Sequence, residues 1–127
     1  MHPYVTLGTR DTAKARAFYD AVFATIGWAA HADDADWRAY SAGGSGEGFV
    51  CFIVSPFNGA EATAGNGTMV AFPARSPAEV DAFYKVAMAH GASDEGAPGP
   101  REAYGPNWYG AYLRDATGNK IAVYHNG

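Results

Sequence analysis

Residues 104–124, YGPNWYGAYLRDATGNKIAVY, decide the fold of this chain. They contain two runs rich in β-branched and aromatic residues, 108–114 and 120–125, which predict two strands. The five residues between the runs include the Asp, Gly and Asn that favour a tight turn. The stretch therefore predicts a β-hairpin near the carboxyl end of the chain.

The predicted hairpin carries two different rows of side chains, because successive residues of a strand point to opposite faces. One row is mainly apolar and is expected to pack against helices: Tyr109, Ala111, Leu113, Ile121, Val123 and His125. The other row holds large aromatic side chains and could line a cavity: Trp108, Gly110, Tyr112, Lys120, Ala122 and Tyr124.

Composition and charge limit the class of protein. The 127 residues fit one domain that can bury a core without disulfides or metals. Charged residues make up 17%, below the roughly 25% that is usual. A net charge of −4 without a Lys/Arg cluster argues against nucleic-acid binding. We also expect no membrane span and no signal peptide, and the single cysteine, Cys51, makes a cytoplasmic location the expectation.

The order of predicted elements occurs twice along the chain. A strand at 4–7 precedes a helix at 12–26 that Asp11 can cap, and a strand at 69–72 precedes a helix that begins with the capping box Ser76–Glu79 and runs to about residue 90. The pair Phe83-Tyr84 follows Phe18-Tyr19 by 65 positions. Further strands are predicted at 28–31, 37–41, 49–54 and 92–97, with a loop at 98–101. Each half thus has the order β-α-β-β-β.

This duplicated order, with YVTLGTRD, ARAFYDAV and IGW near the amino end and YGAYLRDATGNKIAVY near the carboxyl end, resembles the vicinal oxygen chelate superfamily. The superfamily includes glyoxalase I, the bleomycin-resistance proteins and extradiol dioxygenases. The resemblance covers the whole chain and implies an α+β fold. It implies one domain of two tandem βαβββ modules, about 1–57 and 67–127, whose curved mixed sheets surround a small-molecule cavity with the helices outside. It also implies a homodimer.

Enzymes of the superfamily hold a divalent metal with His or carboxylate side chains at four inner strand positions. The resemblance places these positions at Tyr4, Phe52, Met69 and Ala122. A tyrosine is a poor ligand because its phenol has a pKa near 10, and the other three side chains offer no nitrogen or oxygen. We therefore expect no metal at the standard site and no cofactor; a metal could bind only at a non-standard site, such as His2 with His125 if the terminal strands pair.

We expect nine residues to line a ligand pocket: Tyr4, Phe52, Met69, Arg101, Tyr104, Trp108, Tyr112, Ala122 and Tyr124. The alternative is a solid aromatic core, in which each buried phenol or indole would need a hydrogen-bond partner. Arg101 and Tyr104 could bind an anionic group at the mouth, although Arg101 could equally be a solvated loop residue.

Three other groups have a structural and a functional interpretation. Cys51 lies in an apolar run and is expected to be an inert core thiol rather than a nucleophile. His90 is expected to interact with the carboxyl end of its helix. The acidic run Asp33, Asp34 and Asp36 is expected to be a solvated turn, although it could attract a cationic drug.

Two classes of function follow from these residues. The first is a protein of the bleomycin-resistance type that binds a small organic molecule without metal chemistry. The second is an enzyme: a lyase similar to lactoylglutathione lyase or a dioxygenase with a relocated metal, or a metal-free enzyme that uses an acid–base pair such as Tyr4 and Tyr104. The sequence favours the binding protein.

Overall fold

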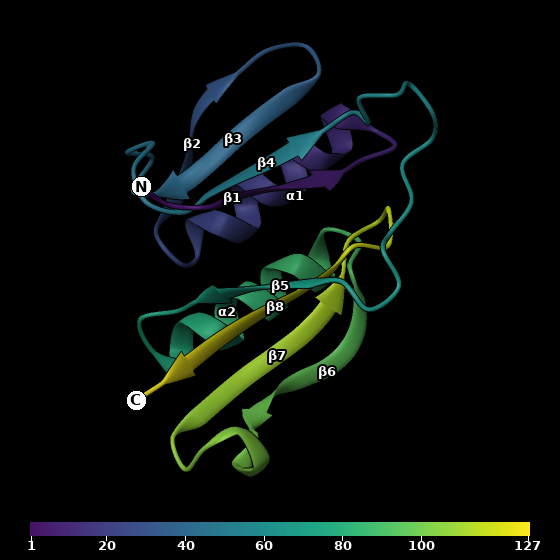
Figure 1. The fold of residues 1–127 in the computed structure, drawn as a ribbon. Helices are drawn as coiled ribbons and strands as arrows, with labels where there is room; N and C mark the ends of the chain where they lie inside the picture. The colour runs from purple at the N-terminus through teal and green to yellow at the C-terminus, as the bar shows by residue number, and fades with distance from the viewer.

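The first half of the chain folds into a four-stranded sheet with one helix against it (Figure 1). The computed structural model describes residues 1–127. β1 pairs in parallel with β4, and β4, β3 and β2 are antiparallel, so the strand order is β1-β4-β3-β2. The elements are β1 (Tyr4–Gly8), α1 (Thr12–Ala24), β2 (Trp28–Asp33), β3 (Trp37–Ala42) and β4 (Val50–Val54).

The second half repeats this topology with the strand order β5-β8-β7-β6. Its elements are β5 (Met69–Pro73), α2 (Pro77–Ala89), β6 (Ser93–Pro100), the 3-10 turn η1 (Glu102–Tyr104), β7 (Trp108–Arg114) and β8 (Lys120–Asn126). The predicted α+β fold with tandem βαβββ modules is therefore confirmed. The residues between Val54 and Met69 connect the modules, which we call the first and second module.

The predicted loop at 98–101 is wrong in its first part, because β6 continues to Pro100. The pairing between β6 and β7 shifts register twice, after Asp94 and after Gly96. These irregularities allow Gly99 to lie opposite Gly110 and Pro100 opposite Tyr109. Proline is tolerated there because β6 is an edge strand, where a missing N–H removes no interior hydrogen bond.

Local capping sets the start of both helices. The Asp11 side chain accepts a hydrogen bond from the Lys14 amide, and Ser76 accepts one from the Glu79 amide. Glu79 departs from the predicted capping box, since its carboxylate accepts from the amide of Arg75 and not from that of Ser76. Gly27 lies three residues beyond the end of α1 at Ala24 and has a φ of 76°, a value that favours glycine and leads the chain into β2.

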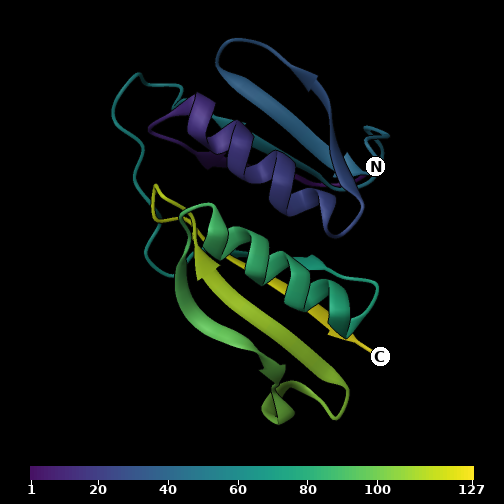
Figure 2. The same cartoon turned by 180° about the vertical axis from the view of Figure 1, so that it is seen from behind.

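The two helices lie side by side on one side of the molecule, and both sheets leave their other face uncovered (Figures 1 and 2). The core fills the space between helices and sheets and continues from one module to the other. Phe72 of β5 contacts Phe23 of α1 with ring centroids 4.9 Å apart, and Trp28 of β2 at 5.4 Å. Neither helix has the length and apolarity that a membrane crossing requires.

Candidate functional site: the open face of the two sheets

The face of the sheets that the helices leave uncovered, called here the open face, carries the predicted aromatic row. Side chains alternate along each strand, so Leu7, Phe72 and Leu113 enter the core while Tyr4, Met69 and Tyr112 point the other way. Tyr4 is 69% exposed and Met69 is 42% exposed. The predicted apolar row of the hairpin packs towards the helices. The structure thus places the nine predicted pocket residues on or beside one face.

The first module contributes three contacting rings, Tyr4, Phe52 and Trp37, which we call the first aromatic group. Tyr4 and Phe52 meet edge to face at 5.3 Å between centroids, and Phe52 meets Trp37 at 5.6 Å. Sequence reasoning missed Trp37. The signal that could have placed it on this face was its alternation with Tyr40, whose ring enters the core from the opposite face of β3.

The second module contributes Tyr104, Trp108 and Tyr124, the second aromatic group. The rings of Trp108 and Tyr124 are stacked, with centroids 4.6 Å apart and planes at 4°, and Tyr104 meets Trp108 at 5.8 Å. Gly110 gives the indole room, because a Cβ at this position would lie 3.2 Å from Trp108 Nε1. The Tyr112 hydroxyl is 3.7 Å from the same point. The indole N–H and the Tyr112 hydroxyl therefore lie over the same glycine.

The polar tips of these rings are not used to hold the fold together. Trp108 Nε1 is shielded from solvent and has no hydrogen-bond partner. The hydroxyls of Tyr4, Tyr112 and Tyr124 also make no hydrogen bond within the chain, whereas Tyr19, Tyr40, Tyr84 and Tyr109 on the helix side each donate to a carboxylate. A buried donor without an acceptor, such as Trp108 Nε1, costs roughly 1–3 kcal/mol, so it is expected where a further molecule supplies the acceptor.

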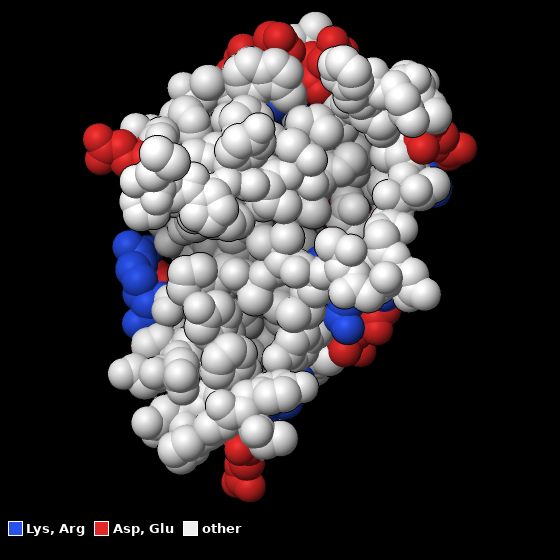
Figure 3. Space-filling view, viewed as in Figure 1, with Lys and Arg blue, Asp and Glu red and all other residues white.

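Figure 3 shows that most of the open face is uncharged. Two cations flank the ring of Tyr112: Arg101 Cζ is 5.5 Å and Lys120 Nζ is 6.0 Å from its centroid. The Arg101 guanidinium donates to the carbonyls of Ala97, Gly99 and Pro100, so it supports the irregular strand β6. The side chain of Lys120 makes no ion pair and no hydrogen bond.

The four positions that the sequence resemblance assigns to metal ligands do not offer a fitting donor set. Tyr4 and Phe52 lie together on the first sheet, and Met69 and Ala122 lie on neighbouring strands of the second. Three of these side chains have no nitrogen or oxygen, so the residues present do not fit a divalent metal. No three His, Cys, Asp or Glu side chains lie close enough together to hold an ion.

The histidines are dispersed. The expectation that the terminal strands could pair and bring His2 to His125 is wrong, because β1 and β8 belong to different sheets. A ring nitrogen of His125 lies 3.1 Å from the Ala74 carbonyl. As expected, His90 interacts with the end of its helix, with Nδ1 2.9 Å from the Val86 carbonyl.

The other sequence candidates have structural roles. Cys51 is fully buried, and burial raises the pKa of its thiol to about 12, so it is not available as a thiolate nucleophile. Asp33 is paired with Arg38 at 2.8 Å and with Arg16 of α1 at 3.4 Å, on the side of the β2–β3 hairpin that faces α1. Tyr4 and Tyr104, the suggested acid–base pair, belong to different modules and are both exposed.

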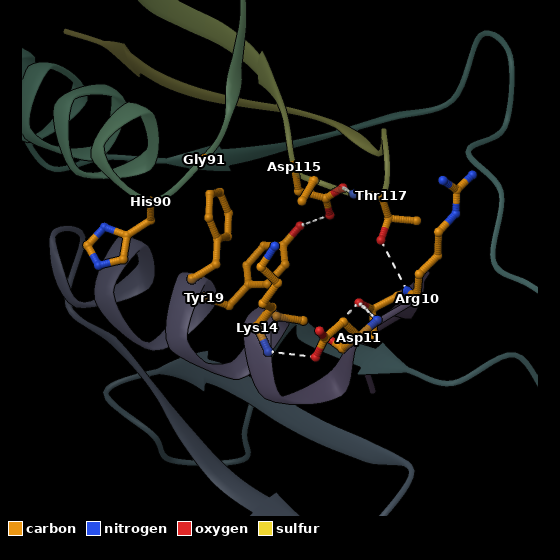
Figure 4. A pocket seen from close by; sticks show the side chains of 12 residues that line it. Arg10, Asp11, Lys14, Tyr19, His90, Gly91, Asp115 and Thr117 are labelled. Carbon is orange, nitrogen blue, oxygen red and sulfur yellow. Dashed lines mark hydrogen bonds between the residues drawn. The ribbon is translucent and has the colours of Figure 1, made fainter.

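A cavity of about 330 Å³ lies away from the open face, between the start of α1, the end of α2 and the β7–β8 turn (Figure 4). Its lining includes Arg10, Lys14, Tyr19, His90 and Asp115. The Tyr19 hydroxyl donates to Asp115, and the Arg10 amide donates to the Thr117 hydroxyl. The sequence did not predict this cavity because residues from both modules form it.

Comparison with known proteins places these features in context. No family model matches the sequence, and no curated protein matches it. The structure is similar to a glyoxalase/bleomycin resistance protein from Albidiferax ferrireducens T118, with 34% identity, a TM-score of 0.87 and coverage of 98% of this chain and 97% of that one.

A second solved structure, a glyoxalase/bleomycin resistance protein/dioxygenase family enzyme from Burkholderia phytofirmans PsJN, shares 25% identity with a TM-score of 0.74, over 98% of this chain and 97% of that one. A glyoxalase-related enzyme from Fulvimarina pelagi is 20% identical with a TM-score of 0.77, over 99% of this chain and 88% of that one, and supports the fold alone.

Proposed function

The chain belongs to the glyoxalase/bleomycin resistance protein family, and on this premise we propose that it binds a small, flat organic molecule on the open face, without the family's standard metal site. The observation that carries the proposal is the presence of two groups of contacting rings, Tyr4–Phe52–Trp37 and Tyr104–Trp108–Tyr124, on a face with few charges. Aromatic walls with a few unpaired polar tips suit a flat ligand, which can stack on a ring and accept a hydrogen bond.

We further propose that the functional unit is a homodimer in the cytoplasm. In one chain the open face is bare, and it exposes large apolar side chains that include Tyr4, Met69 and Tyr104. A second copy that covers this face would turn it into an enclosed cavity and would remove the apolar surface from water. Solution scattering at micromolar concentration should show a dimer, and a monodisperse monomer would contradict this part of the proposal.

Binding is tested with a panel of flat aromatic compounds, measured by calorimetry and by the shift in melting temperature. A ligand that binds only the folded chain stabilises it by about 2.7 kcal/mol when its concentration is a hundred times Kd. Tyr124→Leu should weaken the affinity for any compound that binds the wild-type protein, because it removes one ring of the stack. The control Tyr84→Leu removes a tyrosine from the helix side and should leave affinity unchanged. If no compound shifts the melting temperature, the proposal fails.

The absence of metal chemistry is tested separately. The purified protein is incubated with Ni, Zn, Mn or Fe, dialysed, and analysed for bound metal and for turnover of a hemithioacetal and a catechol. We expect neither stoichiometric metal nor turnover, because Phe52, Met69 and Ala122 offer no nitrogen or oxygen ligand to these metals. Stoichiometric metal with turnover would favour the enzymatic alternative.

A further inference from the structure

Lys120 differs from every other cation in the chain. Arg10, Arg16, Arg38, Arg75 and Arg114 each form an ion pair, and Arg101 donates to three carbonyls. Of the three lysines, Lys14 and Lys85 are exposed to water, whereas Lys120 is half-buried on β8 beside Ala122 and Tyr124. Its side chain is thus partly covered by the sheet, while its ammonium group lies near the ring of Tyr112 and has no carboxylate partner.

The surroundings of Lys120 favour a negative charge on a bound molecule. Lys120 Nζ lies 6.0 Å from the centroid of the Tyr112 ring, and Cζ of the Arg101 guanidinium lies 5.5 Å from it. Neither forms an ion pair with an Asp or Glu, so both charges flank the ring of Tyr112 without a carboxylate partner. The nearby cation Arg114 is already paired with Glu95 at 2.7 Å. An anion bound beside the Tyr112 ring is attracted by both cations, and a bound cation is repelled by both.

The same place offers hydrogen bonds to an anionic group. The Tyr112 hydroxyl has no partner in the chain and lies within 4 Å of the point over Gly110 that Trp108 Nε1 also approaches. The stacked rings of Trp108 and Tyr124 are next to this point. A positive group, a hydroxyl donor and a flat apolar surface thus follow one another across the second module.

We propose that Lys120 and the Tyr112 hydroxyl form an anion subsite, so that the ligand is a flat organic acid whose ring lies against the second aromatic group and whose carboxylate faces Lys120. This inference rests on the proposed binding function and adds the charge of the ligand to it. Lys120 acts here as a specificity residue, because it selects acids over neutral and cationic compounds of the same shape.

The test uses three probes of one shape: 2-naphthoate, 2-naphthamide and 2-naphthylmethylammonium. Calorimetry at low salt should give about fivefold tighter binding of the acid than of the amide, the upper end of the contribution of one partly exposed ion pair. The ammonium compound should bind most weakly. Lys120→Met should abolish the preference for the acid, Lys120→Arg should retain it, and the control Lys85→Met on α2 should not change it.

The outcomes distinguish a failure of the anion subsite from a failure of the proposed ligand binding. If the three probes bind with equal affinity, or if Lys120→Met keeps the preference for the acid, the anion subsite is wrong while ligand binding stands. If none of the probes binds the wild-type protein, both fail. A preference for the acid that disappears in Lys120→Met and also falls with rising salt supports the subsite.

Discussion

The hydroxyl of Tyr19 on α1 donates a 2.6 Å hydrogen bond to Oδ2 of Asp115 in the β7–β8 turn, and this bond joins the two modules (Figure 4). Asp115 Oδ1 accepts the amides of Thr117, Gly118 and Asn119. The Asn119 side chain donates to Asp115 and to the Gly8 carbonyl of β1. The turn from Asp115 to Asn119 is therefore a structural joint between the modules, and the face proposed to bind a ligand lies elsewhere on the same hairpin.

Loss of the carboxylate at this joint should destabilise the protein strongly. Asp115→Ala leaves the Tyr19 hydroxyl and the turn amides without their acceptor, and we expect the free energy of unfolding to fall by about 3 kcal/mol. Tyr19→Phe removes one bond and should cost about 1–2 kcal/mol. Urea denaturation measures both, with Tyr84→Phe on the protein surface as control. A change below about 0.5 kcal/mol for Asp115→Ala, the size of an ordinary surface substitution, would contradict the role of the joint.

The buried phenol of Tyr19 and the buried thiol of Cys51 should make the fold less stable in alkali. Burial, followed by the charge of Asp115, raises the pKa of Tyr19, and burial raises the pKa of Cys51 to about 12. In the unfolded chain these groups ionise near pH 10 and 9, while the folded chain keeps their protons. The unfolded state then binds fewer protons, so stability is fully present below pH 9 and falls as pH rises towards 12.

The decline is measured by urea denaturation from pH 8 to 11, in steps of about half a unit. Its slope should approach ~1.4 kcal/mol per pH unit for each contributing group. Cys51→Ala should be less stable at pH 8 but should show a shallower decline above pH 9, because one of the contributing groups is gone. An identical slope in the two proteins would argue against the shifted pKa of Cys51.

A methyl group on Gly110 should disturb the second aromatic group without unfolding the protein. Gly110→Ala places a Cβ 3.2 Å from Trp108 Nε1, so the indole must move relative to Tyr124. We expect a changed near-ultraviolet circular dichroism spectrum and at least a severalfold loss of affinity for flat ligands. Ala71→Ser, exposed on the same face but outside the aromatic group, serves as control. Unchanged spectra and affinity would show that the stack is not part of the site.

Local signals in the sequence predicted the helices and strands but not the contacts between them. Asp11 and Ser76 mark the helix starts because a capping bond reaches only three residues along the chain. The end of β6 at Pro100 was missed because its pairing depends on bulges opposite β7. The bond from Tyr19 to Asp115 spans 96 positions, and no periodic pattern encodes it. The position of Lys120 became informative only when the structure showed that five of the six arginines form ion pairs and that Arg101 donates to backbone carbonyls.

A single charge on the open face should dissociate the proposed homodimer. Met69 is 42% exposed on this face, and Met88 is 36% exposed on the helix side, so the two methionines form a matched pair. Met69→Glu buries a carboxylate without a partner if a second copy covers the face, and such burial is strongly unfavourable. Solution scattering should show monomers for Met69→Glu and dimers for Met88→Glu. Dissociation by Met88→Glu alone would move the interface to the helices, and dimers in both variants would remove the open face from the interface.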